Sequence, residues 1–514
     1  MKKSALFVVL LLAIVGAVAP FYLQSPDTQG WTQLKRFSSY EELKSFLKAS
    51  SQVRPYYDKE SLVNPMRSGA LEAAPSYSTT NVQVEGVDET DTVKTDGEYI
   101  YVVSGNNITI VRAYPPEGAA VLSTIGLNGT VVGIFINGDR LVVFEQPNPY
   151  ILVRPLAGEA SHGTFRTSIR VYAVSDRRSP ILRREVALDG WYFNSRMIGD
   201  YVYAVIHQPV IRASSEGEDK VILPKVYVDG WVREIPASEI YYSDVADYSY
   251  TFTTMVALNV QNDREEPTHK TILMGATSSM YVSRDNIYIV ISKWTTSEVK
   301  TLGSLIGDVA RRVRTLQVEG ESTVIYRIHV EGSKIESKAS GEVPGRVLNQ
   351  FSMDEYKGHF RIATTTGQVW SSQAPSRNHV YVLNMNLSIV GRLEDLAPGE
   401  TIYSARFMGE RCYLVTFRKV DPLFVIDLKD STNPRVLGQL KITGYSDYLH
   451  PYDETHVIGI GKETVAAEEG NFAWYQGVKI SLFDVSNVSK PKEIAKYEIG
   501  DRGTDSPILR DHHA

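Results

Sequence analysis

Three acidic side chains near residue 90 have the chemistry of a site for a hard cation. Asp88, Glu89 and Asp91 lie in one short segment, and Asp96 follows them. Carboxylate oxygens are the ligands that Ca²⁺ prefers. The spacing matches neither an EF-hand loop nor a calcium-binding nonapeptide repeat. Two interpretations stay open: a weak Ca²⁺ site formed by Asp88, Glu89 and Asp91, or a set of solvated charges at turns.

A second group of side chains that commonly bind metals lies at the other end of the chain. Asp511, His512 and His513 are consecutive and combine one carboxylate with two imidazoles. Nitrogen and oxygen ligands of this kind hold divalent transition metals. The alternative is that they are ordinary polar residues of a chain end.

Aromatic and carboxylate side chains gather in a long insertion, residues 209–250. The group that could contact a ligand contains Tyr227, Trp231, Tyr241, Tyr242, Asp244 and Asp247. Aromatic rings beside carboxylates suit stacking on a sugar or contact with a protein. We therefore expect a glycan or protein ligand here, against the alternative of a loop packed on its neighbouring unit.

Catalytic residues stay unknown at this stage. The sequence has no G-x-S-x-G, H-E-x-x-H, phosphate-loop or C-x-x-C motif. Its one cysteine, Cys412, lies in the apolar run 411–417 and is expected to be a buried small hydrophobe. A net charge of -6 without a basic cluster argues against a nucleic-acid partner. These observations favour a non-enzymatic module.

The rest of the sequence predicts the scaffold that positions these groups. From about residue 92 a unit of four strands recurs seven times, with turns such as Asp96-Gly97 and Gly199-Asp200 between its first and second strands. Such dipeptides supply the positive φ angles of tight hairpins. The third strands are rich in Val, Ile and Tyr and begin near Ile108, Ile169, Thr254, Val324, His379, Leu423 and Lys479. The pattern predicts an all-β protein, a β-propeller of seven four-stranded blades.

Two details refine this prediction. Asp427 and Asp484 close third strands before polar turns, where their carboxylates would accept hydrogen bonds from the following backbone. The segment 505–514 resembles the first strand of an eighth unit. Because an open propeller edge leaves backbone groups unpaired, either residues 75–92 close the ring or the propeller is truncated at the C-terminus.

Long connections are expected on one face only. The enlarged segments are 147–167, 209–250, 294–321, 369–377 and 463–477, and each joins a second strand to a third. Strand direction alternates within a blade, so these connections emerge on the same side. Apolar residues at helical spacing from Leu302 to Val313 predict a docked helix over 298–314.

The N-terminus has the pattern of an export signal. Lys2 and Lys3 precede an apolar run that extends from Ala5 to Leu23 and is long enough to span a bilayer. Pro20 follows the small-residue triplet 17–19 and disfavours cleavage, so an uncleaved membrane anchor is favoured over a removed signal peptide. The sequence divides into a signal or anchor segment (1–24), a juxtamembrane linker with a helix over 38–49 (25–91) and the propeller (92–514).

Two segments carry a family resemblance. Residues 79–111, TTNVQVEGVDETDTVKTDGEYIYVVSGNNITIV, and residues 484–514 resemble a family of secreted archaeal and bacterial proteins with a C-terminal β-propeller distantly related to WD40 repeats. The resemblance implies the fold and an extracytoplasmic location. The family has no established activity, so it implies no catalytic residue.

Two functions from different classes remain. The favoured one is an extracytoplasmic, membrane-anchored propeller that acts as a binding or scaffold module, because the loops are one-sided and catalytic motifs are absent. The alternative is a carbohydrate-active or other hydrolytic enzyme with a site in the central funnel. A pair of carboxylates about 5 to 9 Å apart would favour the enzyme.

Overall fold

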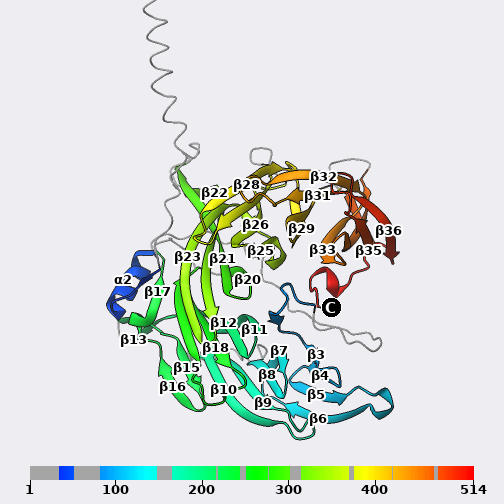
Figure 1. Ribbon diagram of the computed structural model, residues 1–514. Helices are drawn as coiled ribbons and strands as arrows, with labels where there is room; N and C mark the ends of the chain where they lie inside the picture. The colour runs from blue at the N-terminus through cyan, green and yellow to red at the C-terminus, as the bar shows by residue number, and fades with distance from the viewer. Residues whose placement is uncertain are drawn as a thin grey trace, which may run out of the picture.

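Antiparallel sheets are arranged around a central axis in the computed structural model (Figure 1). The structure describes residues 34–50, 81–147, 165–215, 218–243, 250–275, 277–300, 314–369, 375–418, 421–467 and 473–513. The predicted signal or anchor segment, 1–24, lies outside these residues. Where the structure describes helices, none is long and apolar enough to cross a membrane.

Seven sheets in the described residues each contain four strands in chain order. Sheet 1 contains β3 (Val93–Thr95), β4 (Tyr99–Ser104), β5 (Asn107–Arg112) and β6 (Ala120–Gly126). Sheet 2 contains β7 (Thr130–Asn137), β8 (Arg140–Gln146), β9 (Arg166–Ala173) and β10 (Ile181–Asp189). Sheet 3 contains β11 (Trp191–Ile198), β12 (Tyr201–Pro209), β18 (Thr251–Asn259) and β19 (Thr268–Met274). Sheet 4 contains β20 (Thr277–Val282), β21 (Asn286–Lys300), β22 (Arg314–Glu331) and β23 (Lys334–Pro344).

The later sheets follow the same order. Sheet 5 contains β25 (Met353–Tyr356), β26 (His359–Thr366), β27 (Arg377–Asn384) and β28 (Ile389–Leu396), and β24 (Arg346–Val347) also pairs with β26. Sheet 6 contains β29 (Thr401–Met408), β30 (Arg411–Phe417), β31 (Asp421–Asp427) and β32 (Arg435–Ile442). Sheet 7 contains β33 (Tyr445–Pro451), β34 (His456–Ala466), β35 (Ala473–Asp484) and β36 (Lys492–Ile499). The all-β class is confirmed, and each predicted third strand is the third strand of its sheet.

The hydrophobic core lies between neighbouring sheets. Val380 and Val382 of sheet 5, for example, pack in one cluster with Cys412, Leu414 and Ile426 of sheet 6. Cys412 is fully buried, as predicted, and burial raises the pKa of its thiol to about 12. The cysteine is therefore a packing residue in the protonated form.

One contact recurs from each sheet to the next. In sheets 1 to 3 a side chain on the fourth strand donates a hydrogen bond to the next sheet. The acceptor is a backbone carbonyl in the turn that joins the third and fourth strands of that next sheet. These bonds are Ser123 Oγ to Arg177 O, Arg184 Nη1 to Glu265 O and Thr268 Oγ1 to Ser333 O.

In sheets 4 to 6 the fourth strand has a glycine at this contact. Because glycine has no Cβ atom, the carbonyl oxygen in the turn of the next sheet can lie close to the strand. A Cβ atom added to these glycines would lie 2.4 Å from Leu387 O at Gly341, 2.1 Å from Ser431 O at Gly391 and 2.3 Å from Val488 O at Gly438.

The C-terminal segment differs from the expected start of an eighth unit. Residues 507–509 form a 3-10 helix, η6 (Pro507–Leu509), and no strand is assigned within the described residues 501–513. The proline fixes φ near the helical range and supplies no backbone donor for a strand ladder. The number of blades in the complete ring stays a prediction.

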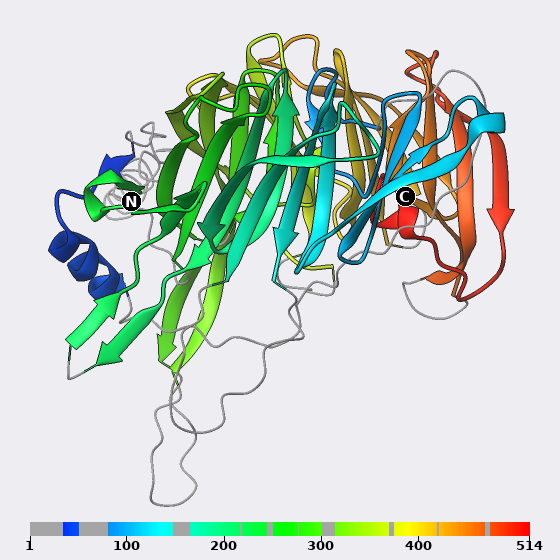
Figure 2. The same ribbon diagram turned by 90° about the horizontal axis from the view of Figure 1, so that it is seen from below.

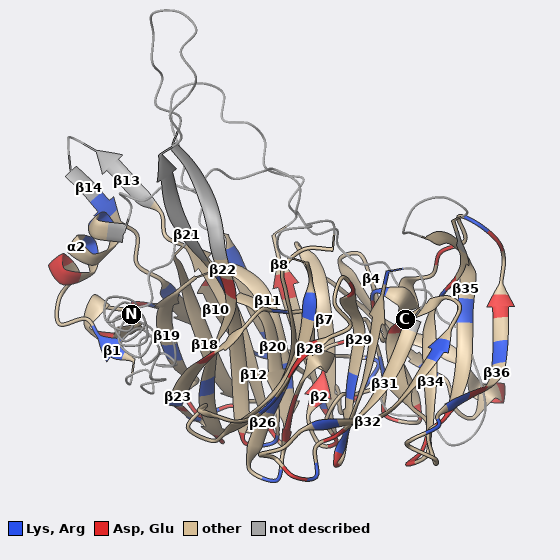
Figure 3. Cartoon of the chain, turned by 90° about the horizontal axis from the view of Figure 1, so that it is seen from above, with Lys and Arg blue, Asp and Glu red and all other residues tan. Residues whose placement is uncertain are grey.

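Insertions project from one side of the molecule, as Figures 2 and 3 show for the hairpin β13–β14 and the long hairpin β21–β22. The 209–250 insertion joins the second and third strands of sheet 3. It contains β13 (Arg212–Ser215), β14 (Glu218–Val221), β15 (Lys225–Val228), β16 (Trp231–Glu234), the 3-10 helix η4 (Ala237–Glu239) and β17 (Ile240–Tyr242). β15 extends sheet 2 by pairing with β10, and β16 forms the edge beyond it.

The helix predicted over 298–314 is wrong at both of its ends. Glu298, Val299 and Lys300 belong to β21 and pair with residues 314–316 of β22. A long β ladder that starts in the core of sheet 4 continues outward here and overrides the helical spacing. Residues 301–313 lie outside the described part of the chain.

A short helix, α2 (Tyr40–Ser50), packs on the outer end of sheet 3 (Figure 1). Its N-terminus is capped, because Glu42 N donates to Ser39 Oγ at 3.2 Å and the Glu42 carboxylate accepts from Ser38 N at 2.7 Å. Leu43 and Leu47 are buried, and Phe46 packs 5.0 Å from the ring of Tyr242. β1 (Lys35–Arg36) pairs with β17, so the segment before the helix joins the same sheet.

Candidate functional site

Residues 81–92, which we call the axial segment, cross the centre of the molecule, with a turn at Val84–Val87. β2 (Asp88–Glu89) pairs with β11 of sheet 3, and Asp91 pairs with Ile134 of sheet 2. The Gln83 side chain donates to Met353 O of sheet 5 at 3.1 Å. Figure 1 shows this dark-blue segment beside the red C-terminal turn in the centre. The segment therefore ties the innermost strands of several sheets together.

Glu89 of this segment is buried, with 3% of its surface exposed. Its Oε2 atom lies 3.2 Å from Arg196 Nη2 and 3.2 Å from His512 Nε2, and it accepts from Gln350 Nε2. Its Oε1 atom accepts from Gln83 N at 3.0 Å. Burial alone would raise the pKa of Glu89, but Arg196 and His512 outweigh burial and hold that pKa well below the usual range. The side chain is therefore a carboxylate at any physiological pH.

His512 and His513 approach this carboxylate from the C-terminal turn. The two rings lie 3.9 Å apart, and His512 packs edge-on against Phe351 at 4.8 Å. His513 Nε2 is 3.7 Å from Glu89 Oε2 and is buried without a hydrogen-bond partner in the described residues. Burial, together with His512, lowers the pKa of His513 and favours its neutral imidazole. We name Glu89, His512 and His513 the axial cluster. Each residue offers one atom that could bind a metal ion, and these three atoms lie within 4.8 Å of one another.

A buried cation lies near the axial cluster. Arg406, on β29, is 8% exposed, and its guanidinium lies 5.2 Å from the ring centre of Phe351. Its Nη1 atom has no hydrogen-bond partner in the described residues. Burial lowers the pKa of Arg406, and the negative charge of Glu89 partly offsets this lowering. Arg196 and Arg406 are thus two buried guanidinium groups near the Glu89 carboxylate.

The two groups of metal-binding residues predicted from the sequence are brought together only in part. Glu89 from the first group meets His512 and His513 from the second. Asp88 instead pairs with Lys94 at 2.8 Å, and the Asp91 carboxylate accepts from Thr92 N at 2.6 Å. Asp511 accepts from the backbone of His513 at 3.0 Å. Each of the three carboxylates Asp88, Glu89 and Asp91 thus has a partner of its own. The Ca²⁺ site formed by these residues stays a prediction.

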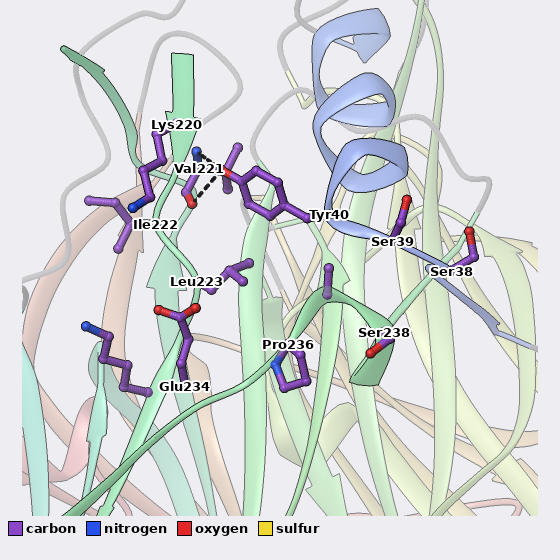
Figure 4. Close-up of a pocket in the computed structure, with 12 residues that line it drawn as sticks. Ser38, Ser39, Tyr40, Lys220, Val221, Ile222, Leu223, Glu234, Pro236 and Ser238 are labelled. Carbon is purple, nitrogen blue, oxygen red and sulfur yellow. Dashed lines mark hydrogen bonds between the residues drawn. The ribbon is translucent and has the colours of Figure 1, made fainter. Parts of the chain in front are cut away.

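A groove lies between α2 and the insertion (Figure 4). It encloses about 790 Å³ and has an apolar floor that includes Val221, Leu223 and Ala237. Polar side chains form its rim: Ser38, Ser39, Lys220, Lys225, Glu234 and Ser238. The Tyr40 hydroxyl accepts from Val221 N at 2.8 Å and donates to Val221 O at 3.2 Å. These two hydrogen bonds, drawn in Figure 4, fix the helix to β14.

Aromatic residues predicted as ligand contacts in the insertion have different environments. Tyr227 donates to Asp189 at 3.2 Å and lies 3.6 Å under the Arg166 guanidinium. Tyr242 stacks on Phe37 at 4.1 Å. Tyr241 is covered by Lys270, whose ammonium lies 3.9 Å from the ring centre.

Trp231 differs from these three, because 83% of its surface is exposed. Asp244 and Asp247 lie outside the described residues. Of the described members of the group, Trp231 therefore presents the largest free surface to a partner.

Comparison with known proteins places the chain in a family. A family model described as Beta propeller domain matches residues 77–514. The chain belongs to this family. Uncharacterized proteins of Methanocaldococcus jannaschii and Archaeoglobus fulgidus are 29% and 27% identical over the whole chain, and the alignments cover 86% and 88% of those proteins. A solved structure described as a hypothetical selenium-binding protein from Sulfolobus tokodaii has a TM-score of 0.32 at 10% identity, covering 80% of each chain. The family model confirms the predicted propeller class.

Proposed function

We propose that this protein is an extracytoplasmic, membrane-anchored binding module that captures an extended segment of a partner protein at β16. One observation carries the proposal. Trp231 and Val232 are 83% and 58% exposed on a strand whose outer edge pairs with no other strand in the described residues. Natural proteins usually protect such edges with charges, prolines or a covering element.

Backbone chemistry explains what this edge can bind. An unpaired strand offers a row of N–H and C=O groups to a chain in extended conformation, and side-chain pockets then add specificity. Trp231 supplies a large rigid surface of the type that dominates binding energy at interfaces. The groove beside α2 can receive an apolar side chain on its floor, while Lys220 and Lys225 attract a carboxylate at its rim. The chemistry suits an extended acidic peptide segment.

A glycan fits the groove beside α2 less well than a peptide does. Sugar recognition uses the free faces of aromatic rings beside hydrogen-bonding groups. Here the face of Tyr242 is covered by Phe37, that of Tyr241 by Lys270, and the Tyr40 hydroxyl is engaged by the backbone of β14. The floor of the groove is aliphatic rather than aromatic.

The location follows from the N-terminal sequence. Lys2 and Lys3 before an apolar run predict that the N-terminus stays inside and the propeller lies outside. Pro20 favours retention of the segment as an anchor. N-terminal sequencing of the mature protein should begin at residue 1 or 2; a start between residues 20 and 26 would show a cleaved signal peptide instead.

The partner class is tested with two libraries offered to the purified protein. We expect selection of acidic, extended peptides from a displayed random library and no specific signal on a glycan array. Trp231→Ala should weaken a selected peptide by roughly 30-fold or more. Tyr497→Ala is the matched control, because Tyr497 is 70% exposed on the edge strand β36 of another sheet. Binding of glycans alone, or equal loss in the two variants, would contradict the proposal.

One observation favours the enzymatic alternative as a second candidate. Asp447 lies on β33, an innermost strand, and burial raises the pKa of its carboxyl to about 7. A carboxylic acid that is partly protonated at neutral pH can act as a general acid in glycoside hydrolysis. Hydrolysis of chromogenic glycosides by the wild-type protein, abolished by Asp447→Asn, would establish this candidate; inactivity on a broad substrate panel would remove it.

A further inference from the structure

We propose that the axial cluster binds a divalent transition metal ion of the zinc class. Its three side chains come from opposite ends of the described propeller: Glu89 from the axial segment, and His512 and His513 from the C-terminal turn. Glu89 Oε2 and His512 Nε2 lie 3.2 Å apart, although the residues are 423 positions apart in the chain. Such a convergence requires the folded ring and cannot arise from local sequence.

The distances match the coordination shell of a small cation. Zinc binds imidazole nitrogen and carboxylate oxygen at about 2.0–2.2 Å, so neighbouring ligand atoms in a tetrahedral shell lie about 3.4 Å apart. Glu89 Oε2 is 3.2 Å from His512 Nε2 and 3.7 Å from His513 Nε2. Only small side-chain shifts are needed for all three to share one ion. Three protein ligands leave the fourth position for water or another ligand.

The ligand types select the class of metal. Two imidazole nitrogens with one carboxylate suit zinc and its neighbours in the transition series. Calcium and magnesium prefer shells made of oxygen atoms. The proposed zinc-class site therefore differs from the Ca²⁺ site predicted from the sequence. It shares Glu89 with that site but uses His512 and His513 in place of Asp88 and Asp91.

A second observation supports the cation. His513 Nε2 is buried and has no hydrogen-bond partner in the described residues. An unpaired polar atom in the interior is costly, and most such atoms in native proteins have a partner. Because the lone pair of this nitrogen lies beside a carboxylate oxygen and a second imidazole, a shared cation would satisfy it.

The surrounding residues can hold the ligands in place. Glu89 Oε1 accepts from the backbone N–H of Gln83, which orients the carboxylate. Asp511 accepts from the backbone N–H of His513 and lies 3.7 Å from its Nδ1 atom. Outer partners of this type orient the ligands of protein metal sites.

Arg196 is the group that competes for the carboxylate. Its guanidinium also donates to Asn194 Oδ1 at 2.6 Å and to Ser195 O at 2.8 Å. These two acceptors keep Arg196 satisfied when Glu89 turns Oε2 toward a cation. An ion pair between Glu89 and Arg196 would by itself leave His513 Nε2 without a partner.

The experiment uses the purified full-length protein, stripped with a chelator and titrated with Zn²⁺ and separately with Co²⁺. We expect one equivalent to bind, with Co²⁺ giving the intense visible absorption of tetrahedral coordination. His513→Ala should lower the affinity at least about 100-fold, since removal even of an outer partner costs 10–100-fold. His450→Ala is the control, because His450 is near the cluster but interacts with Tyr448 instead. It should bind as the wild type does.

A melting experiment separates loss of binding from loss of fold. Zn²⁺ should raise the Tm of the wild type and of His450→Ala, and leave the Tm of His513→Ala unchanged. The proposal is overturned if the wild type takes up no stoichiometric Zn²⁺, if His513→Ala binds as tightly as the wild type, or if Ca²⁺ rather than Zn²⁺ raises the Tm.

Discussion

Three acidic side chains near the axis each lie beside a cationic partner. Glu89 lies between Arg196 and His512, Asp88 is paired with Lys94, and Asp354 is paired with Arg361. These ion pairs join residues of the axial segment and of inner strands, so they help to hold the centre of the molecule together. Asp447 has a different environment, and its titration can be tested directly.

Asp447→Asn should stabilise the protein at neutral and alkaline pH. Burial raises the pKa of Asp447 to about 7, so the folded state binds this proton more tightly than the unfolded state does. The stability it contributes is full below about pH 4 and is lost as pH rises toward 7. The variant should exceed the wild type by up to roughly 4 kcal/mol above pH 7 and match it near pH 4. Urea unfolding across this range measures the difference; a gain that is equal at every pH would contradict the assigned cause.

Residue-scale prediction from sequence succeeded where a residue's partners are local. Asp427 and Asp484 accept hydrogen bonds from Lys429 N and Ser486 N two positions later, as the turn pattern indicated. Glu89 could be singled out as a possible metal ligand, but its partners Gln350 and His512 lie 261 and 423 positions away. No local pattern encodes such contacts. The same reason hid Arg196 and Arg406, which lie on strands of different sheets.

At the scale of elements, the repeated contact between consecutive sheets explains a glycine in several fourth strands. Gly391 lies in β28 at a position where a side chain would meet the Ser431 carbonyl of sheet 6. Gly341 and Gly438 have the same role in their sheets. Glycine inside a strand normally weakens it, so close approach of another backbone is the compensating reason.

Gly391→Ala should therefore destabilise the propeller. The new Cβ would lie 2.1 Å from Ser431 O, so sheet 6 must move away. We expect a loss of roughly 1–3 kcal/mol, as for other overpacked sites. Gly126→Ala is the matched control, because the nearest atom to its Cβ is a side-chain oxygen at 3.5 Å, and it should change stability by less than about 0.5 kcal/mol. Equal melting temperatures for the two variants would argue against this role.

The insertion shows which elements could be read from the sequence. Asp229 and Gly230 have φ angles of 47° and 93°, and this Asp-Gly pair between two short apolar runs is a hairpin signal that identifies β15 and β16. The addition of these strands to sheet 2, and of β17 to sheet 3, depends on tertiary contacts and could not be predicted. The ends of the predicted helix instead belong to the outer part of the β21–β22 hairpin, where residues 298–300 pair with 314–316 and continue the ladder of sheet 4.

Taken as a whole, the molecule combines an occupied centre with one elaborated side. The axial segment and the C-terminal turn lie in the centre, while the β13–β14 and β21–β22 hairpins project from one side (Figure 3). Loop insertions cost little stability, because closure entropy grows slowly with length. The projection of the described insertions from one side is in keeping with the partner binding proposed above.

Photo-crosslinking from position 231 tests this account most directly. An aromatic photoreactive amino acid, which keeps a large ring at this position, replaces Trp231 in the full-length protein, produced in its own cells, and a second version carries it at Tyr497 on β36, the edge strand of sheet 7. The account predicts a specific crosslinked partner from position 231 that is absent from position 497, with the crosslink lying in an extended segment of that partner. A partner captured from position 497 and not from position 231 would contradict it.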